Sequence, residues 1–270
     1  MNHYNVNEVI AAKSDLVFIT LDTLRYDVAQ ALWQEGKLPN LSKWLPDTGW
    51  QKRHSPASFT YAAHHAFFAG FLPTPVAAGV HPRLFATQFA GSTSVNKNTY
   101  VVAQDNIVEG LAAAGYQTIC IGGVGFFNKK TALSKVFPSL FEQSYWESAF
   151  GVTEPHSTQY QLEKAVELLA AKKRQTFLFI NISALHQPNY YYVPTATEPI
   201  DSLVSHAAAL EYVDSQLPIL MEALQQREQD SFIICCGDHG TTYGEDGYTG
   251  HRIGHPKVWE VPYLEILLRK

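Results

Sequence analysis

Three short segments, far apart in the sequence, carry side chains that could bind a metal ion and supply a nucleophile. LDTLRYD places Asp22 directly after an apolar run, and CCGDHG places Asp238 and His239 after another. Carboxylate oxygens and an imidazole nitrogen together suit Zn²⁺ or Mn²⁺. In the third segment, SPASFTYAAHHAFFAG, Thr60 opens an apolar stretch with a helical pattern. These residue types predict a divalent-metal site with a hydroxyl group beside it.

Each of these residues also has a purely structural interpretation. Asp22 could be a turn residue or a helix cap after its strand, and Ser58 or Thr60 could cap the helix that follows. A catalytic Thr60 would instead use the helix N-terminus, whose free N–H groups and positive dipole favour a phosphate beside it. A bound metal would lower the pKa of the hydroxyl group. The two interpretations of Thr60 therefore differ in whether a metal is present.

The elements that position these residues can be predicted from the hydrophobic pattern. Continuous apolar runs bounded by turn residues are typical of strands that are covered on both faces. Such runs occupy 15–20, 117–123, 175–183, 231–237 and 261–269. Helical patterns occupy 106–116, 158–174 and 205–226. Gly115 is placed to cap the first helix and Pro218 to kink or break the last.

The alternation of strands and helices predicts a doubly wound α/β sheet in one domain, residues 1–270. In such sheets the ligand crevice lies beyond the carboxyl ends of the strands. Asp22 follows the first predicted strand, and Asp238 and His239 follow the fourth. We therefore expect these three side chains to meet at one edge of the sheet.

The composition of the 270-residue chain argues against several classes of protein. The net charge of −5, without a cluster of Lys and Arg, is not that of a nucleic-acid-binding protein. No apolar run approaches the roughly 20 residues that span a bilayer, and no signal-peptide pattern opens the chain, so no membrane partner is expected. Cys120, Cys235 and Cys236 lie in apolar runs. This placement predicts reduced core thiols and a cytoplasmic location.

The order of the segments resembles that of the alkaline phosphatase/sulfatase superfamily, and within it the sulfatase-like hydrolases and transferases. The segments are, in order, LDTLRYD, SPASFTYAAHHAFFAG, LAAAGYQT, ALHQPNYYY, GDHGTTYGEDGYTGH and WEVPYL. The resemblance implies an α/β fold of the alkaline phosphatase type, a three-layer α/β/α sandwich with a mostly parallel central sheet. It also implies that Asp22, Thr60, Asp238 and His239 bind one divalent metal ion, with zinc expected and manganese or calcium as alternatives.

The nucleophile position separates the branches of this superfamily. True sulfatases carry Cys or Ser in a C-x-P-x-R setting and convert it to formylglycine, whereas this chain reads TYAAH from Thr60 onward. It also reads IGGVGFF where sulfatases carry G-K-W-H. Sulfate-ester hydrolysis by the formylglycine route is therefore not expected. The threonine resembles that of phosphoethanolamine and phosphoglycerol transferases and related phosphoesterases, in which it is transiently phosphorylated or otherwise substituted.

Further histidines extend the resemblance toward the substrate. His186 in HQPNYYY resembles a phosphate-contacting histidine of that branch. His251 resembles a second substrate histidine, which would stabilise charge on the phosphoryl oxygens or protonate a leaving alkoxide. A loop residue bonded to the backbone is the alternative for both. Additional substrate contacts are predicted at His64, Arg252 and His255, with core packing or a solvated loop as their alternatives.

A second metal ion has less support in the sequence. Binuclear members of the superfamily hold it with an Asp-x-x-x-His segment and a later histidine. Asp201 and His206 are one residue too far apart for that spacing. One ion is therefore predicted, and a second ion held by His186, His251 and His255 is left open.

The predicted function is metal-dependent hydrolysis of a small-molecule phosphate mono- or diester, with Thr60 as the nucleophile and His186 and His251 contacting the phosphoryl group. A phosphotransferase or a sulfatase-type hydrolase on the same fold is the first alternative. The loop 73–89 and the tyrosine run 190–192 are predicted to rim the pocket.

A second alternative is a non-catalytic nucleotide- or partner-binding module. IGGVGFFN follows a predicted strand and supplies Gly122, Gly123 and Gly125. A dinucleotide-binding fingerprint needs a third glycine where Asn128 stands, and it should open the first βα unit. Both departures weaken this alternative.

Overall fold

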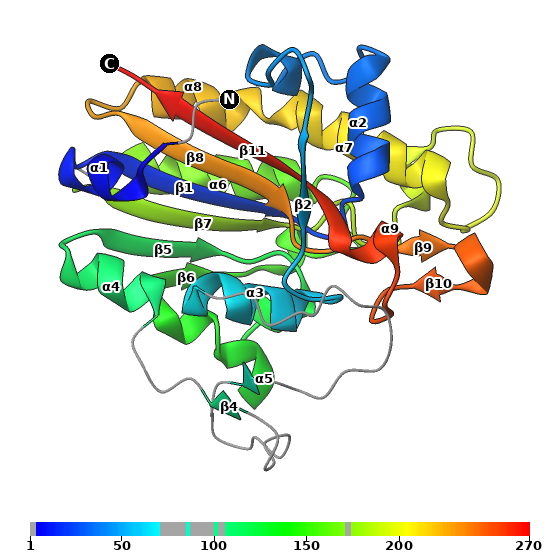
Figure 1. The fold of residues 1–270 in the computed structure, drawn as a ribbon, viewed down its shortest axis with the longest axis horizontal. Coiled ribbons are helices and arrows are strands. Elements are labelled where there is room, and N and C mark those ends of the chain that lie inside the picture. Colours follow the sequence, from blue (N-terminus) through cyan, green and yellow to red (C-terminus); the bar gives the residue numbers. More distant parts are fainter. Residues whose placement is uncertain (1–3, 71–84, 87–99, 102–105, 171–173) are drawn as a thin grey trace.

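The computed structural model describes residues 4–70, 85–86, 100–101, 106–170 and 174–270. Its centre is a seven-stranded sheet with the strand order β2-β11-β8-β1-β7-β5-β6 (Figure 1). In sequence order these strands are β1 (Asp15–Leu21), β2 (Gln51–His54), β5 (Gln117–Ile121), β6 (Gln143–Tyr145), β7 (Thr176–Ile182), β8 (Ser231–Gly237) and β11 (Glu260–Leu268). The predicted apolar runs are therefore the five long strands of one sheet.

The sheet is mostly parallel. Strand β1 pairs in parallel with β7 and β8, and β5 pairs in parallel with β6 and β7. Strand β11 runs opposite to the other six strands of this sheet, since its pairings with β8 and β2 are antiparallel. The carboxyl ends of β1, β7 and β8 consequently meet at one edge of the sheet.

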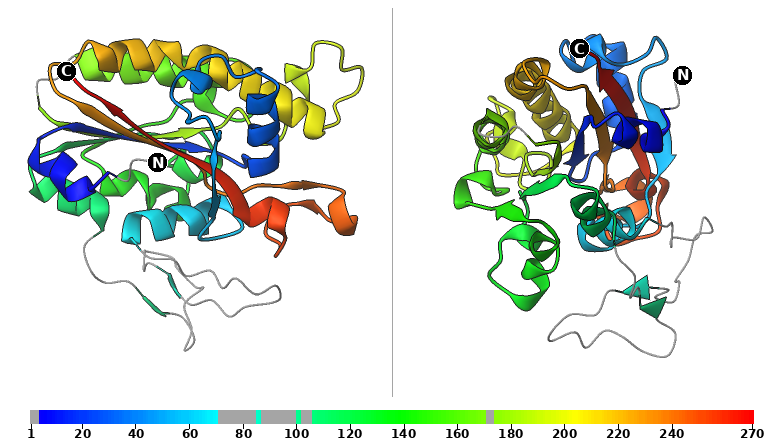
Figure 2. Two further views of the ribbon diagram at one scale, coloured as in Figure 1. Left: turned by 45° about the horizontal axis from the view of Figure 1, so that its top comes forward. Right: turned by 90° about the vertical axis from the view of Figure 1, so that its left-hand side faces the viewer.

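Helices cover both faces of the sheet, which gives the predicted three-layer α/β/α architecture (Figure 2). One face carries α2 (Tyr26–Gln34), α6 (Ser157–Ala170), α7 (Leu203–Gln216) and α8 (Pro218–Gln225). The other carries α1 (Val6–Ala11), α3 (Thr60–Ala69) and α4 (Ile107–Ala113). Strand β1 serves both layers, because Val17 and Ile19 pack against the first set of helices and Leu16 against the second.

Shorter elements connect these layers. They are η1 (Leu41–Lys43), η2 (Gly125–Phe127), α5 (Ala132–Lys135), η3 (Pro138–Leu140), η4 (Ser148–Phe150), η5 (Tyr190–Tyr192), η6 (Glu245–Gly247), α9 (Pro256–Trp259) and the two-stranded pairs β3 (Phe85–Ala86) with β4 (Tyr100–Val101) and β9 (Thr242–Tyr243) with β10 (Thr249–Gly250). No helix in the described part of the chain is long and apolar enough to cross a membrane.

Two residues predicted to end or break helices do so in the structure. Pro218 breaks the helical pattern 205–226 into α7 and α8 and is the first residue of α8, where its missing N–H is no loss. Gly115 follows α4 with a φ of +95°, a conformation that glycine adopts without strain. The thiols of Cys120, Cys235 and Cys236 are buried and free, as predicted.

The glycines of IGGVGFFN serve packing and not a nucleotide. A Cβ atom on Gly122 would lie 2.1 Å from Cβ of Phe127, and one on Gly123 would lie 2.4 Å from the carbonyl oxygen of Asn181. Gly125 opens only the three-residue turn η2. A dinucleotide-binding loop needs a full helix after its glycines, so the dinucleotide-binding interpretation of this segment is wrong.

Candidate active site

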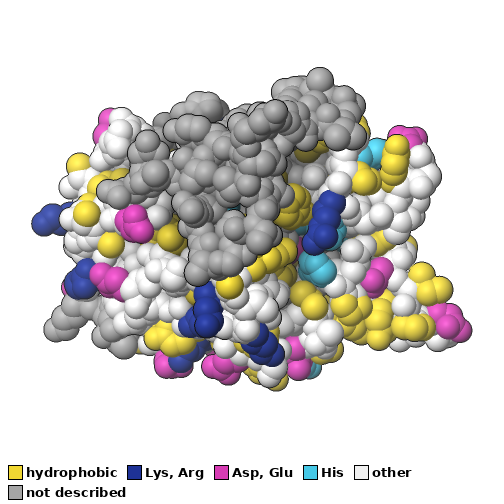
Figure 3. Space-filling view, turned by 90° about the horizontal axis from the view of Figure 1, so that it is seen from below, with side chains coloured by type: hydrophobic (Ala, Val, Ile, Leu, Met, Phe, Trp, Pro, Cys, Tyr) yellow, Lys and Arg dark blue, Asp and Glu magenta, His cyan; other side chains and the backbone are white. Residues whose placement is uncertain are grey.

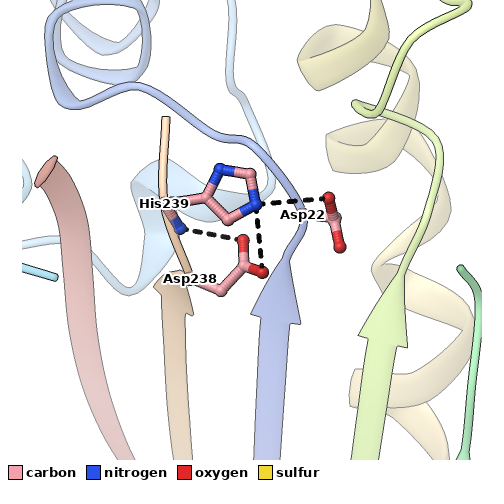
Figure 4. A group of neighbouring side chains, drawn as sticks. All are labelled: Asp22, Asp238 and His239. Carbon is pink, nitrogen blue, oxygen red and sulfur yellow. Dashed lines mark hydrogen bonds and ion pairs between the residues drawn. The ribbon is translucent and has the colours of Figure 1, made fainter. Parts of the chain in front are cut away.

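The predicted metal ligands converge at the carboxyl ends of β1 and β8. The two strands are in register up to Leu21 opposite Gly237, so Asp22 and Asp238 leave the sheet side by side. His239 Nε2 lies 4.0 Å from Asp22 Oδ1 and 3.6 Å from Asp238 Oδ2 (Figure 4). All three side chains are fully buried, and they can offer one ligand atom each to a common ion.

The two carboxylates are only half satisfied by hydrogen bonds. Asp238 Oδ1 accepts from the backbone N–H groups of Thr23 (3.1 Å) and His239 (2.9 Å). Asp22 Oδ1 and Asp238 Oδ2 are buried and accept no hydrogen bond from the residues that the structure describes. Buried charged oxygens without partners are costly, and a divalent cation bound between them would satisfy both. The residues present therefore fit a metal ion.

The orientation of His239 supports the same conclusion. Its Nδ1 lies 2.8 Å from the carbonyl oxygen of Gly240. A carbonyl can only accept, so Nδ1 carries the proton and Nε2 presents a lone pair toward the two carboxylates. Metal-ligating histidines are commonly fixed in this way by a backbone carbonyl.

Thr60 lies at the same place, as the first residue of α3. Its hydroxyl oxygen is 3.3 Å from Asp22 Oδ2 and 3.2 Å from His239 Nε2. The capping interpretation is wrong for Ser58 and Thr60, because the N-cap is Phe59 and no side chain caps the helix. The Thr60 hydroxyl therefore faces the metal ligands, and the first N–H groups of α3 are left for an anion.

The path into α3 is fixed by contacts to the same strand end. Ser55 Oγ donates a hydrogen bond to the carbonyl oxygen of Asp238 and accepts one from the N–H of Ala57 (3.2 Å). The N–H of Arg252 donates to the carbonyl oxygen of Ser58 at 2.8 Å. These bonds hold the segment before Thr60 against the residues that follow β8.

Burial dominates the electrostatics of the metal ligands. It raises the pKa of Asp238 to about 7, and burial together with the charge of Asp238 raises the pKa of Asp22 to about 6. Burial also lowers the pKa of His239. Without a cation, the site thus resists the two negative charges that its carboxylates would carry, and a bound cation would reverse this effect.

The structure places His186 and His251 beside the metal ligands. The ring of His251 lies 4.7 Å from that of His239 and 6.0 Å from that of His186, measured between centroids. Burial and the neighbouring imidazoles lower the pKa of His251 to about 3, so its ring is neutral near neutral pH. Figure 3 shows imidazole and basic side chains gathered at one place on this face of the molecule.

The three additional substrate contacts have different outcomes. Arg252 is exposed beside the site, with its guanidinium 5.6 Å from the ring of Phe59. His64 is fully buried, and its Nδ1 lies 2.8 Å from the carbonyl oxygen of Thr60 and 3.7 Å from Asp238 Oδ2. Both ring nitrogens of His255 are engaged, Nε2 with Asp246 at 3.1 Å and Nδ1 with the N–H of Lys257 at 3.1 Å. The positions of His64 and His255 therefore favour structural roles.

Other residues named from the sequence lie away from the metal ligands. Asp201 accepts hydrogen bonds from the N–H groups of Asn189 and Tyr190. His206 Nδ1 lies 3.2 Å from the hydroxyl oxygen of Tyr243. Both residues thus have structural partners. The tyrosine run is the turn η5, and the loop 73–89 lies outside the described residues except for β3.

One residue close to the metal ligands is not predicted from the sequence. Asn181 in β7 donates a hydrogen bond from Nδ2 to Asp22 Oδ2 at 3.3 Å, and it is fully buried. The signal that could have revealed it is a lone amide inside the apolar run TFLFINI, because buried amides need partners.

The chain is similar to a known protein family and to several solved structures. The family model for sulfatases matches residues 14–265. No curated protein sequence matches the chain. Its fold is similar to the C-terminal periplasmic domain of phosphoethanolamine transferase EptC from Campylobacter jejuni (TM-score 0.67, 14% identity, 94% of this chain and 79% of that chain). It is also similar to the soluble domain of lipooligosaccharide phosphoethanolamine transferase A from Neisseria meningitidis (TM-score 0.65, 16% identity, 94% and 76%).

A third solved structure of the same fold contains a metal. It is the C-terminal periplasmic domain of EcEptC from Escherichia coli in complex with zinc (TM-score 0.62, 13% identity, 95% of this chain and 73% of that chain). These likenesses confirm the predicted alkaline phosphatase-like fold. Two of these similar domains are described as periplasmic, which does not support the predicted cytoplasmic location, so that location of this chain stays a prediction.

Proposed function

The chain belongs to the sulfatase family, and on that premise we propose that it is a metal-dependent hydrolase of phosphate mono- or diesters with Thr60 as its nucleophile. The observation that carries the proposal is the position of the Thr60 hydroxyl at a helix N-terminus, 3.3 Å from Asp22 and 3.2 Å from His239. Beside it, Asp22 and Asp238 each present one buried oxygen that lacks a partner among the described residues.

The ion would be held by Asp22, Asp238, His239 and Thr60, with zinc as the expected metal. When bound, it supplies positive charge that lowers the pKa of the hydroxyl group and offsets the charge of the phosphate oxygens. The donors suit zinc because it takes carboxylate oxygen and imidazole nitrogen in a compact site.

The chain's own residues then account for the transfer. Thr60 Oγ1 forms a bond to phosphorus in line with the ester oxygen, whose bond to phosphorus breaks. The hydroxyl proton moves to Asp22 Oδ2, the acceptor that already faces it. The departing alkoxide takes a proton from solvent. Water next attacks the phosphorus of phosphorylated Thr60, and the bond between phosphorus and Oγ1 breaks. Oγ1 takes back the proton held by Asp22, one water proton stays on the released phosphate or phosphomonoester, and the other goes to solvent.

The imidazoles and the helix N-terminus orient the phosphoryl group. His251 Nδ1 is buried without a hydrogen-bond partner in the described residues, and its neutral ring can donate to a phosphate oxygen. His186 Nδ1 contacts the carbonyl oxygen of Gln187, which leaves Nε2 toward the site. The first N–H groups of α3 add donors that favour an anion at this position.

A phosphotransferase is the second candidate, and the likeness to two phosphoethanolamine transferases favours it. It would share the first half of the reaction and differ in the acceptor, an alcohol in place of water. A sulfatase-type hydrolase has less support, because the nucleophile is Thr60 and not Cys or Ser.

The experiment is a comparison of Thr60→Ala and Ser58→Ala on a panel of p-nitrophenyl phosphate, bis-p-nitrophenyl phosphate and p-nitrophenyl sulfate with added zinc. Thr60→Ala should lose at least about 1,000-fold in kcat/KM on the phosphate esters, since alanine has no hydroxyl group to attack phosphorus. Ser58→Ala removes a hydroxyl at the same helix end and should keep the wild-type rate. Intact-mass spectrometry of rapidly quenched wild type should reveal one phosphoryl group, absent in Thr60→Ala.

Equal rates for Thr60→Ala and the wild type would exclude Thr60 as the nucleophile. Turnover of the sulfate ester alone would favour the sulfatase-type alternative. Phosphate-ester turnover that rises with added alcohol, with the phosphorylated alcohol as product, would favour the transferase.

A further inference from the structure

A chain of polar side chains crosses the apolar core between Asp22 and helix α3. Thr20 in β1 and Asn181 in β7 are direct partners in the sheet register. Asn181 Nδ2 lies 3.2 Å from Thr20 Oγ1 and 3.3 Å from Asp22 Oδ2. Thr20 Oγ1 lies 3.0 Å from His64 Nε2, and His64 Nδ1 lies 2.8 Å from the carbonyl oxygen of Thr60. None of these side chains is exposed by more than 2%.

The direction of every hydrogen bond in this series of side chains is determined by the groups at its two ends. The Thr60 carbonyl can only accept, so the neutral His64 ring carries its proton on Nδ1 and accepts at Nε2. Thr20 must therefore donate its single hydroxyl proton to His64. The oxygen of Thr20 then accepts from one N–H of the Asn181 amide, and the other N–H is left for Asp22.

The orientation of the Asn181 amide is also fixed by a residue outside this series of side chains. The backbone N–H of Val124 donates to Asn181 Oδ1 at 3.1 Å, which identifies Oδ1 as the oxygen and Nδ2 as the nitrogen. The whole network is consequently polarised in one direction, from Val124 to the Thr60 carbonyl. Reversal of any one bond would leave a buried donor facing a donor.

We propose that Asn181, Thr20 and His64 form a positioning relay that couples the metal-binding carboxylate of Asp22 to the nucleophile helix. The inference rests on the proposed function and extends it to three residues that do not touch the substrate. At one end of the relay, Asn181 fixes the rotation of the Asp22 carboxylate. At the other end, His64 fixes the first turn of α3 through its bond to the carbonyl oxygen of Thr60, four residues earlier. The distance between the Thr60 hydroxyl and Asp22 Oδ2 is set by both ends.

The relay predicts that its disruption lowers the rate and the metal affinity without weakening substrate binding. A displacement of a reacting group by about 1 Å can cost about 100-fold in rate. Outer-shell partners of metal ligands are typically worth about 10–100-fold in activity or metal affinity. A relay of hydrogen bonds should show both effects when its middle member is removed.

The test uses two substitutions of Thr20 and one matched control. Thr20→Val keeps the shape of the side chain and removes the hydroxyl, whereas Thr20→Ser keeps the hydroxyl. The control is Thr118→Val in β5, because Thr118 is equally buried and its hydroxyl accepts a hydrogen bond from the N–H of Glu142 at 2.9 Å, away from the site. Thr20→Val and Thr118→Val should both lower the melting temperature.

Thr20→Val should lower kcat on a phosphate ester by about 10–100-fold while KM changes by less than about threefold. Thr20→Ser should restore most of the rate, and Thr118→Val should keep it. Zinc affinity measured by chelator competition should fall about 10-fold or more in Thr20→Val only. A wild-type kcat and zinc affinity in folded Thr20→Val would overturn the proposal.

A second measurement needs no turnover, and its first part uses only the wild type. Ring ¹⁵N resonances of His64 in the zinc-free wild type should show a protonated Nδ1 and a hydrogen-bonded, unprotonated Nε2. A protonated Nε2 would reverse the relay and overturn it. In Thr20→Val the Nε2 resonance should move toward that of a free lone pair. If the wild type cleaves no phosphate ester, the proposed function fails, while these resonances and the zinc affinity still decide the relay.

Discussion

Two buried aspartates at opposite ends of strand β1 have opposite surroundings. Asp15, at the amino end, accepts hydrogen bonds from Arg227 Nε at 2.7 Å and from the N–H of Thr176 at 2.8 Å, and Gln229 Nε2 lies 3.1 Å away. Asp22, at the carboxyl end, is equally buried and has no Arg or Lys partner in the described residues. The charge of a second carboxylate, Asp238, raises the pKa of Asp22 further.

Asp15 has the surroundings of a structural carboxylate, and Asp22 has those of the proposed metal ligand. A buried charge that the fold uses for stability brings its counter-charge with it, as Asp15 does with Arg227. At Asp22 the counter-charge is missing from the described chain while the geometry is held by Asn181 and Thr60. The carboxyl end of the strand therefore presents buried carboxylates that fit the proposed cation, whereas the amino end does not.

The largest expected effect is on metal content. Asp22→Asn should reduce bound zinc from about one equivalent per chain to well below that, with a loss of zinc affinity greater than about 100-fold and a comparable loss of rate. The metal-free protein should keep or gain stability, because the substitution removes a buried charge that lacks a counter-ion. Elemental analysis and thermal melts with and without chelator check both parts.

Asp15→Asn is the matched control at the other end of the strand. It should leave zinc content unchanged but lower the stability by about 3–5 kcal/mol, since it leaves Arg227 without its buried carboxylate. Each kcal/mol corresponds to about 2–4 °C in melting temperature for a domain of this size. Loss of zinc in Asp15→Asn, or retention of zinc in Asp22→Asn, would contradict the assignment of Asp22 to the metal and of Asp15 to stability.

A smaller effect should appear in the pH dependence of the metal-free protein. Burial raises the pKa of Asp238 from 3.8 to about 7, so the folded state favours the protonated carboxyl. The stability that this preference contributes is complete below pH 3.8 and is lost as the pH rises through about 7. Asp238→Asn cannot ionise and should not lose it.

Thermal melts in chelator at about pH 5 and about pH 8 test this prediction. The melting temperature of Asp238→Asn relative to the wild type should increase by several degrees between the two pH values. Added zinc should remove the trend in the wild type, because the ion binds the deprotonated carboxylates. A difference that is independent of pH would mean that Asp238 keeps an ordinary pKa in the metal-free fold.

The sequence predicts the long strands well because burial on both faces leaves continuous apolar runs. The runs 231–237 and 15–20 correspond to β8 and β1 almost to the residue. Strand β2 is not predicted, because Gln51–His54 at the sheet edge reads QKRH, and an edge strand needs little apolar surface. The reversed direction of β11 also leaves no trace in its composition.

The same reasoning explains which site residues could be predicted. Asp22, Asp238 and His239 stand where strands end, so the crevice rule brings them together. His64 and Asn181 lie inside a helix and a strand, and their roles depend on the sheet register between β1 and β7. Register is a property of tertiary packing, which a single sequence does not display.

The smallest expected effect separates two histidines of the same loop. His255 has both ring nitrogens in hydrogen bonds, as Asp15 has both oxygens, whereas the buried Nδ1 of His251 has no hydrogen-bond partner among the described residues. His255→Ala should therefore cost about 1 kcal/mol through the lost cap of α9 and leave zinc content and kcat unchanged.

His251→Ala serves as the counterpart, with kcat lowered about 10-fold or more because a donor to the phosphoryl oxygens is lost. Steady-state kinetics on a phosphate ester, with zinc measured on the same samples, distinguish the two variants. Equal effects on kcat would mean that the lack of a hydrogen-bond partner at His251 Nδ1 does not identify a substrate contact. If only His255→Ala lowered kcat strongly, His255 would be a substrate contact, as the sequence predicts.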